Sequence, residues 1–275
     1  MCSTLRARPL YRRFPDGGFT PLSASRYDAT NAETLTVRTM KTPVAFSIFF
    51  GFLFLLTGCD STDAEPEPVI LDVKMAENVP ADPASGRDPD TGASISNNLF
   101  TLYDLEAGSI LIPSSQTDAA TRQRDSTSTA WDIGFKGTTI IFNGGTSGPG
   151  EAAAQMLAQP FAEVVEAPEG GYIADGENTS CPEVFTPVGP VPGSPYAICT
   201  GSDNGWYNYN AGTMLLSPIP GRTIVLKTAS GNYAKIRILS YYQNNPDPPD
   251  ASVPSRYYTF EYVLRPDGSR DLTSE

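Results

Sequence analysis

Histidine is absent from this chain of 275 residues. Its absence excludes serine and cysteine hydrolases with a histidine base, zinc hydrolases of the H-E-x-x-H type, and every metal centre with a histidine ligand. Basic residues are also scarce, because 19 Lys and Arg stand against 31 Asp and Glu, for a net charge of −12. Nucleic-acid binding needs clustered Lys and Arg to displace counterions from phosphates, so no nucleic-acid partner is expected.

Other common catalytic motifs are missing as well. No Ser-x-x-Lys pair occurs, and the glycine-rich segment 144–150 (GGTSGPG) lacks the Gly-Lys-Ser/Thr ending that brings a lysine to a nucleotide phosphate. We interpret this segment as a structural loop. The acidic turns at 88–90 and 244–250 offer oxygen ligands for a weak Ca²⁺ site but lack EF-hand spacing, and no glycosidase carboxylate pair is marked. The sequence therefore predicts a protein that is not an enzyme.

The N-terminal region carries an export signal. Residues 44–56 (VAFSIFFGFLFLL) are too short for a stable transmembrane anchor but suit the apolar core of a signal peptide. Residues 56–59 (LTGC) resemble the bacterial lipobox, which predicts a lipoprotein signal peptide at 40–58 and a lipidated Cys59. An ordinary signal peptide or a buried strand with a chance cysteine is the alternative. Residues 1–39 are then a mis-called upstream start or an unusually long leader.

The expected mature chain, 59–275, is more acidic than the whole. Seven of the 19 basic and three of the 31 acidic residues lie before it, which leaves 12 against 28 and a net charge of −16. Residues 60–68 (DSTDAEPEP) predict a solvated tether that follows the lipidated Cys59. The chain is thus expected at the outer membrane or the cell surface, held by its lipid rather than by attraction to anionic headgroups.

Two cysteines, Cys181 and Cys199, lie in the mature chain beyond the tether. The 17 residues between them are rich in proline and glycine. In an oxidising, extracytoplasmic compartment we expect a disulfide here, which would stabilise the fold by about 3 kcal/mol. The alternative is a thiol pair that binds a metal, but neither a Cys-x-x-Cys motif nor a histidine accompanies it.

The pattern after the tether predicts a mainly β chain. The expected strands are 69–74, 99–105, 131–135, 138–142, 222–228, 233–242 and 257–264. Alternation places Trp131, Ile133 and Phe135 on one face of their strand. One helix is expected at 150–158, which is alanine-rich and lies between two prolines.

The last three expected strands resemble an antiparallel meander with one buried face. Residues 229–232 (ASGN) suit a hairpin turn between the first two of them. Alternation in 233–242 places Lys235 and Arg237 on one face and Ile236 and Ile238 on the other.

Aromatic residues are concentrated at 205–210 (GWYNYN). These side chains either pack into the core from a strand or form a flat apolar pocket for a planar or sugar-like ligand. Composition alone does not decide between the two.

Several blocks together resemble the HmuY-like family of outer-membrane haem-binding lipoproteins. They are WDIGF, TTIIFNGGTSGPGEAAAQM, GWYNYN, PIPGRTIVLKTASGNYAKIRILSYY and YYTFEYVLRPDG, and the resemblance covers 69–267, before a short tail at 268–275. It implies a single antiparallel β domain with a few short helices. It also implies a lipid-anchored haem scavenger that passes haem to a TonB-dependent outer-membrane receptor.

The chain departs from the family in its possible haem ligands. Family members hold the iron between two axial side chains, usually two His and in some relatives two Met, and this sequence has no His. Thioether sulfur is an allowed axial ligand, so the haem-binding candidates are Met214 and Met156, then Tyr207 or Tyr209 as a phenolate, beside Trp206. No metal is expected beyond a possible haem iron. The alternative is a lipoprotein of the same fold that binds a non-haem ligand or a protein partner.

Overall fold

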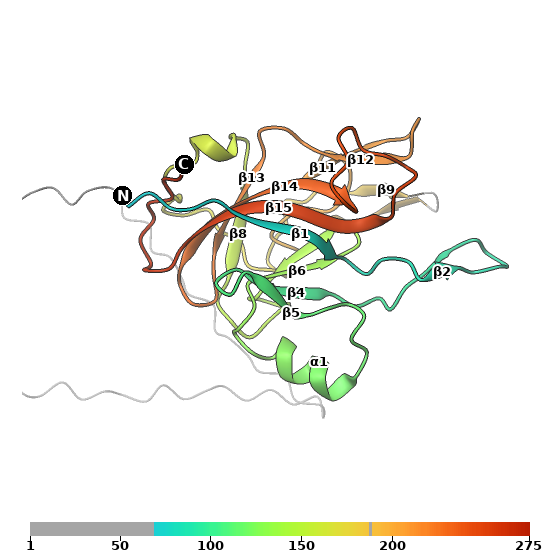
Figure 1. Ribbon diagram of the computed structural model, residues 1–275, viewed down its shortest axis with the longest axis horizontal. Helices are drawn as coiled ribbons and strands as arrows, with labels where there is room; N and C mark the ends of the chain where they lie inside the picture. Colours follow the sequence, from blue (N-terminus) through green and yellow to red (C-terminus); the bar gives the residue numbers. More distant parts are fainter. Residues whose placement is uncertain (1–68, 187–188) are drawn as a thin grey trace, which may run out of the picture. The chain divides into compact units, whose positions relative to one another are not determined.

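The computed structural model describes residues 69–186 and 189–275, which form two larger antiparallel β-sheets and three β-hairpins (Figure 1). The expected mainly β fold with antiparallel sheets is confirmed. The expected leader, signal peptide, lipidated Cys59 and tether lie outside the described residues. Among the residues that are described, no helix is long and apolar enough to cross a membrane.

The larger sheet has five strands in the order β1-β15-β14-β13-β8. Their bounds are β1 (Lys74–Pro80), β8 (Ala153–Leu157), β13 (Thr223–Lys227), β14 (Tyr233–Tyr242) and β15 (Ser255–Arg265). The predicted meander is confirmed, because β14 pairs antiparallel with both β13 and β15. Gly231 in the β13–β14 turn has φ 82°, a conformation that glycine adopts without a steric penalty.

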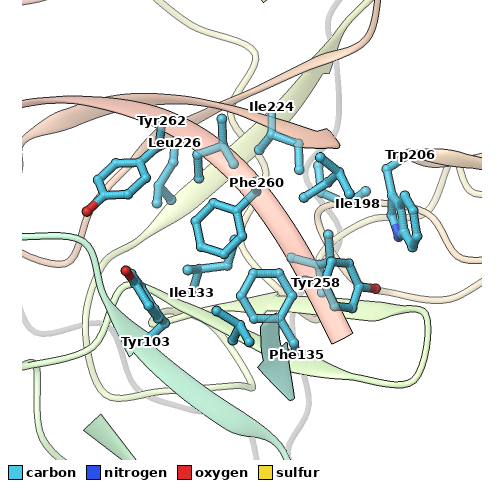
Figure 2. Close-up of a cluster of buried hydrophobic side chains, with 14 of the residues drawn as sticks. Tyr103, Ile133, Phe135, Ile198, Trp206, Ile224, Leu226, Tyr258, Phe260 and Tyr262 are labelled. Carbon is cyan, nitrogen blue, oxygen red and sulfur yellow. The ribbon is translucent and has the colours of Figure 1, made fainter. Parts of the chain in front are cut away.

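The smaller sheet has four strands in the order β5-β4-β6-β7. Their bounds are β4 (Thr101–Asp104), β5 (Ser109–Ile112), β6 (Ile133–Lys136) and β7 (Thr139–Phe142). The main core lies between the two sheets, and Figure 2 shows its aromatic side chains. The ring of Phe260 on β15 lies 5.3 Å from that of Phe135 and 5.4 Å from that of Tyr103. Aromatic pairs in tilted and edge-to-face arrangements at these distances stabilise the packing of the two sheets against each other.

Trp131 is not on the face predicted for it. Ile133 and Phe135 belong to the main core, but Trp131 packs in a separate cluster with Leu102, Ile112 and Ile141. The alternation fails because β6 begins only at Ile133. The preceding Asp132 turns inward, where its carboxylate accepts the backbone N–H of Leu105 at 2.9 Å.

The helix expected at 150–158 is wrong, because these residues contain strand β8. This strand pairs with β13 along its whole length, from Ala153↔Lys227 to Leu157↔Thr223. Ala154 is fully buried, so a small side chain is needed for the strand to lie against the core. The helix propensity of alanine is a weak preference, and pairing with a neighbouring strand overrides it.

The remaining elements are short. The described residues contain one α-helix, α1 (Ala119–Ser126), and one 3₁₀ turn, η1 (Phe161–Glu163). The sequence did not predict α1. Its N-cap is Asp118, whose carboxylate accepts the N–H of Thr121. The hairpins are β2 (Gly86–Arg87) with β3 (Ser94–Ile95), β9 (Val184–Thr186) with β10 (Gly189–Val191), and β11 (Tyr207–Asn210) with β12 (Leu215–Pro218). The strand expected at 69–74 is displaced, since β1 begins at Lys74.

The sequence predicted that Lys235 lies on the open face of the meander, but the structure covers this face at Lys235. Lys235 is fully buried beneath the η1 segment. Its Nζ donates to the carbonyl oxygen of Val164 at 3.0 Å and lies 4.7 Å from the ring centre of Phe161. Leu272 is buried on the same side, and its N–H donates to the carbonyl oxygen of Val165. Segments distant in sequence therefore cover part of this face.

Candidate functional site

The β11–β12 hairpin carries four of the five predicted haem-binding residues, and two of them lie at its buried base. Trp206 and Tyr207 pack against each other, and the Trp206 ring also contacts those of Tyr241 and Tyr258. The indole Nε1–H of Trp206 donates to the carbonyl oxygen of Thr138 at 3.0 Å. At this base, the aromatic cluster is part of the main core.

Tyr209 and Met214 lie farther out on the same hairpin, and both are exposed. Tyr209 pairs across the hairpin with Leu216, so their side chains share one face. Met214 ends the turn with φ 58° and is 74% exposed. A bulky residue rarely adopts this left-handed conformation, so the turn presents the thioether to solvent at an energetic cost of about 1 kcal/mol.

The fifth candidate, Met156, lies on a different element. It belongs to β8, where it pairs with Ile224 of β13. Its side chain is half-buried and packs against the main core. Met156 therefore contributes to packing, whereas the exposed Met75 on β1 makes no such contribution to the core.

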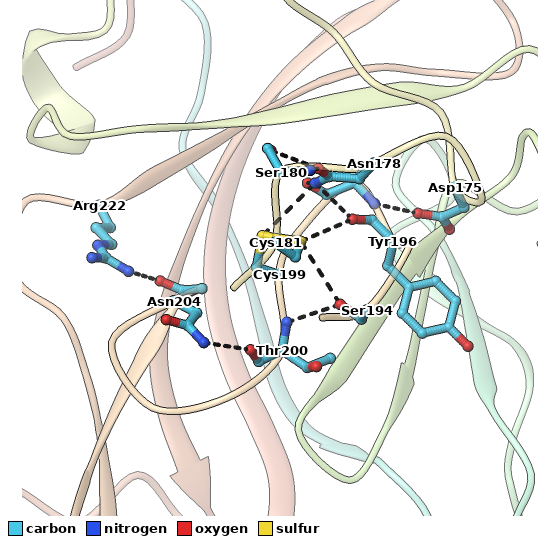
Figure 3. The surroundings of a disulfide bond; sticks show 12 residues. Asp175, Asn178, Ser180, Cys181, Ser194, Tyr196, Cys199, Thr200, Asn204 and Arg222 are labelled. Atoms are coloured by element: carbon cyan, nitrogen blue, oxygen red, sulfur yellow. Dashed lines mark hydrogen bonds between the residues drawn. A yellow bond between two sulfur atoms is a disulfide. The ribbon is translucent and has the colours of Figure 1, made fainter. Parts of the chain in front are cut away.

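The predicted disulfide between Cys181 and Cys199 is present (Figure 3). It closes the base of the segment that carries the β9–β10 hairpin, on which Phe185 is exposed. Beside it, the side-chain amide of Asn178 donates to the carbonyl oxygen of Tyr196 at 3.0 Å. This proline-rich segment is thus held by a covalent link and by side-chain hydrogen bonds.

Asp175 joins the disulfide segment to the smaller sheet. Its carboxylate accepts the backbone N–H groups of Ala197 and Phe142, each at 2.8 Å. Burial raises the pKa of the Asp175 carboxyl, while these two hydrogen bonds oppose that rise. The arrangement is structural, since both backbone donors are satisfied by one buried side chain.

A groove of about 530 Å³ lies beside the β11–β12 hairpin. One wall is β12 with the residues that follow it, the other wall is the second half of β14, and the loop after β14 closes one end. The lining residues are 216–221, 237–242, Asn245, Pro246, Asp247 and Pro249. About half of these side chains are apolar and the rest are polar or aromatic with a hydroxyl, so the groove suits a ligand with both apolar and hydrogen-bonding groups.

The groove is open because its two walls, 216–221 and 237–242, do not pair as neighbouring strands. Strands β13 and β14 pair as far as Ile224↔Ile236. Continuing this register would place Pro220 opposite Ser240 and Pro218 opposite Tyr242, but proline has no N–H to donate to a ladder. The chain instead pairs with β11, where Pro218 lies opposite Tyr207. Among the described residues, one hydrogen bond joins the two walls, from the Leu216 N–H to the hydroxyl oxygen of Tyr242 at 2.9 Å.

The groove carries few charges. Arg237 on one wall forms a salt bridge of 2.8 Å with Glu261 of β15, and Asp247 lies in the closing loop. Burial raises the pKa of the Tyr241 hydroxyl, which therefore stays protonated at neutral pH. Within the part of the chain that the structure describes, no group of three or more His, Cys, Asp or Glu side chains could hold a metal ion.

Haem fits these residues only in part. An iron ligand needs an accessible sulfur, nitrogen or oxygen atom, and the exposed thioether of Met214 and phenol of Tyr209 meet that condition. The aromatic and apolar side chains of Tyr209 and Leu216 would contact a porphyrin face. Trp206 and Tyr207 are instead enclosed by the core. The sequence indicated the hairpin but not the groove beside it.

Comparison with known proteins identifies the family. The family model described as "HmuY protein" matches residues 96–262, which is more than half of the chain. The chain belongs to the HmuY family. HmuY-like proteins are binding proteins. No curated protein matches the chain.

Solved structures similar to this HmuY-family chain come from several bacteria. The apo HmuY analog of Tannerella forsythia is 17% identical, with a TM-score of 0.35, over 72% of this chain and 97% of its own. Apo PinO of Porphyromonas gingivitis is 18% identical, with a TM-score of 0.36, over 70% and 97%. A protein of Bacteroides fragilis, provisionally described as a lipoprotein, is 15% identical, with a TM-score of 0.36, over 70% and 90%.

Proposed function

We propose that this HmuY-family chain is a lipid-anchored binding protein of the cell envelope that captures haem or a related porphyrin without histidine. The ligand would lie at the outer part of the β11–β12 hairpin, next to the open groove. Met214 is the first candidate for the iron ligand, and the phenolate of Tyr209 is the second. The bound haem would supply the iron that these atoms coordinate.

The exposed thioether of Met214 carries this proposal. A methionine that only fills space would be buried, as the half-buried Met156 is against the core. Met214 is instead 74% exposed and sits in a left-handed turn conformation that glycine or asparagine would adopt more easily. A strained, exposed residue at a hairpin end is a reason to infer a binding role.

The neighbouring surface supports a planar ligand. Tyr209 and Leu216 are cross-strand partners on one face, and Leu216 also lines the groove. An aromatic ring beside an aliphatic side chain offers a flat apolar contact area at low entropic cost. A ligand there would extend from the hairpin into the apolar part of the groove.

A haemin titration of residues 60–275 tests this proposal. We expect a saturable shift of the Soret band, and the haemin affinity derived from it should fall at least tenfold in Met214→Ala. Met75→Ala is the matched control, because Met75 is also exposed but lies on β1. A shift that survives Met214→Ala but is lost in Tyr209→Phe would assign the phenolate instead. The absence of a saturable shift would remove haem from the function.

The cellular role in this proposal follows from the N-terminal signal. Lipidation of Cys59 would anchor the chain at the outer membrane or cell surface, and the captured ligand would pass to a TonB-dependent receptor. Metabolic labelling with palmitate tests the anchor: the label and the membrane association should both be lost in Cys59→Ser. Labelling of that variant would contradict the assignment.

A second candidate function is a HmuY-family lipoprotein that binds a protein partner instead of haem. One observation favours it, namely the unpaired half of β14 along the groove. Such a strand edge presents backbone hydrogen-bonding groups that an extended peptide can use.

A further inference from the structure

The second half of β14 lacks a neighbour on one side. On its other side β14 pairs with β15, regularly from Tyr233↔Arg265 to Ile238↔Phe260 and then with register shifts before Ser240 and before Tyr242. Its ladder with β13 stops at Ile236. Among the described residues, no backbone hydrogen bond joins 216–222 to 237–242. The backbone groups of 237–241 that point away from β15 therefore face the groove without a strand partner, although the two register shifts interrupt their regular alternation.

The sequence itself keeps this edge of β14 unpaired. Pro218 and Pro220 cannot donate to β14, and Gly221, with φ 72°, turns the chain toward β13. The separated wall is fixed elsewhere, because the N–H of Ile219 donates to the carbonyl oxygen of Trp206 at 2.9 Å. The groove is thus held open between two ordered segments.

We propose that the groove binds an extended, basic peptide segment of a partner protein, which adds to the open edge of β14 as a further β-strand. The inference rests on the proposed role as a binding protein, and it does not require haem to be the ligand. A peptide strand would supply the backbone partners that this edge lacks. Its apolar side chains would contact the wall formed by Leu216, Pro218 and Ile219.

Length and charge define the occupant further. The open stretch 237–241 has the length of a strand of about five residues, or roughly 17 Å. At its far end the Ser240 hydroxyl already bonds the N–H and the C=O of Tyr242, so the added ladder would end there. Asp247 lies at this end, and the expected mature chain has a net charge of −16, so a basic segment is favoured.

The probe is a synthetic peptide with the sequence of residues 222–228, RTIVLKT, blocked at both ends. It carries the strand that β14 already accepts as a neighbour, and it contains two basic residues. We expect saturable binding to the full chain in a fluorescence anisotropy titration. We also expect slower amide hydrogen exchange at those amides of 237–241 that point away from β15, because these amides gain strand partners.

Two N-methylated forms of the peptide separate strand addition from apolar adhesion. One form is methylated at its second, fourth and sixth residues, and the other at its third and fifth. Because alternate amides of a strand point to opposite sides, only one form should lose at least tenfold in affinity. Equal affinity of both forms, protection outside 237–241, or no saturable binding of the parent peptide would overturn the proposal.

A protein variant provides the matched test. Pro218→Val with Pro220→Val restores two N–H donors to the wall, so the groove should close onto β14 and peptide affinity should fall at least tenfold. Pro192→Val, at an exposed proline outside the groove, should bind as the unmodified chain does. Unchanged peptide binding by the double variant would exclude the open edge of β14 as the binding site. If that variant fails to fold, the two methylated peptides still decide. Haemin binding can succeed or fail independently of either result.

Discussion

The Nζ of Lys235 donates a hydrogen bond of 3.0 Å to the carbonyl oxygen of Val164, which lies 71 residues earlier in the chain. This bond joins the middle strand of the five-stranded sheet to the segment that covers its outer face. Phe161 lies against the same ammonium group. A buried lysine needs such partners, because an unpaired charge in the interior costs several kcal/mol.

Replacement of Lys235 tests how this layer is held. Lys235→Met keeps the volume and removes the buried charge, so the free energy of unfolding should change by less than about 1.5 kcal/mol. Lys235→Ala leaves a cavity and should lower it by about 2–4 kcal/mol. Urea unfolding measures both variants. Equal losses in the two would show that the hydrogen bond, not the packing, holds the segment.

The same lysine gives a dependence on pH. Burial lowers the pKa of the Lys235 ammonium group, and Glu261 opposes that change. Between the lowered pKa and about 10.5 the folded state binds fewer protons than the unfolded state, so stability rises with pH. The stability of the unmodified chain relative to Lys235→Met should therefore increase from pH 7 to pH 10. A constant difference would contradict the lowered pKa.

The sequence predicted correctly those strands whose bounds depend on neighbouring residues, and it failed where a strand depends on distant pairing. The bounds of β14 agree with the expected strand 233–242, because strict alternation and a glycine turn define it. Strand β8 was mistaken for a helix, because its identity depends on pairing with β13, whose residues lie far along the sequence. Lys235 was placed on an open face, since no local pattern reveals that a distant segment covers it.

The candidate site shows the same division. The aromatic hairpin was visible in the sequence, and so was Met214. The groove was not, because its walls come from 216–221, 237–242 and the loop after β14. The one available signal was the pair Pro218 and Pro220 just before a strand, which marks a segment that cannot complete a ladder.

Asp132 should make the protein less stable as pH rises from 4 to 7. Burial raises the pKa of its carboxyl to about 6, and nearby Asp104 and Glu106 add to the rise. The folded state then binds more protons than the unfolded state in this interval, which costs about 3 kcal/mol at pH 7. Asp132→Asn can still accept the Leu105 N–H and should remove most of this loss.

Urea unfolding at pH 4.5 and pH 7 checks the Asp132 prediction. The control is Asp88→Asn, since Asp88 is only half-buried and hydrogen bonds from Thr91 lower the pKa of its carboxyl rather than raise it. An Asp132→Asn variant that loses stability with pH as steeply as the unmodified chain would contradict the raised pKa.

The Cys181–Cys199 disulfide should stabilise the fold mainly by restricting the unfolded chain. For a sequence separation of 18 residues, the double substitution to Ser should lower the free energy of unfolding by about 3 kcal/mol. Reduction of the unmodified protein should give the same loss, which controls for the new hydroxyl groups. A loss in the double variant without a loss on reduction would assign the effect to the serines.

The glycine-rich loop should tolerate no side chain at Gly145. This residue has φ 57°, and a Cβ there would lie 1.9 Å from the carbonyl oxygen of Asp175. Gly145→Ala must therefore displace backbone next to the carboxylate that bonds Phe142 and Ala197, and it should cost more than about 3 kcal/mol. Gly170→Ala is the matched control, because a Cβ there meets nothing within 4 Å. Similar melting temperatures for the two variants would contradict the close approach, whereas a selective loss in Gly145→Ala would fit the interpretation of this loop as structural.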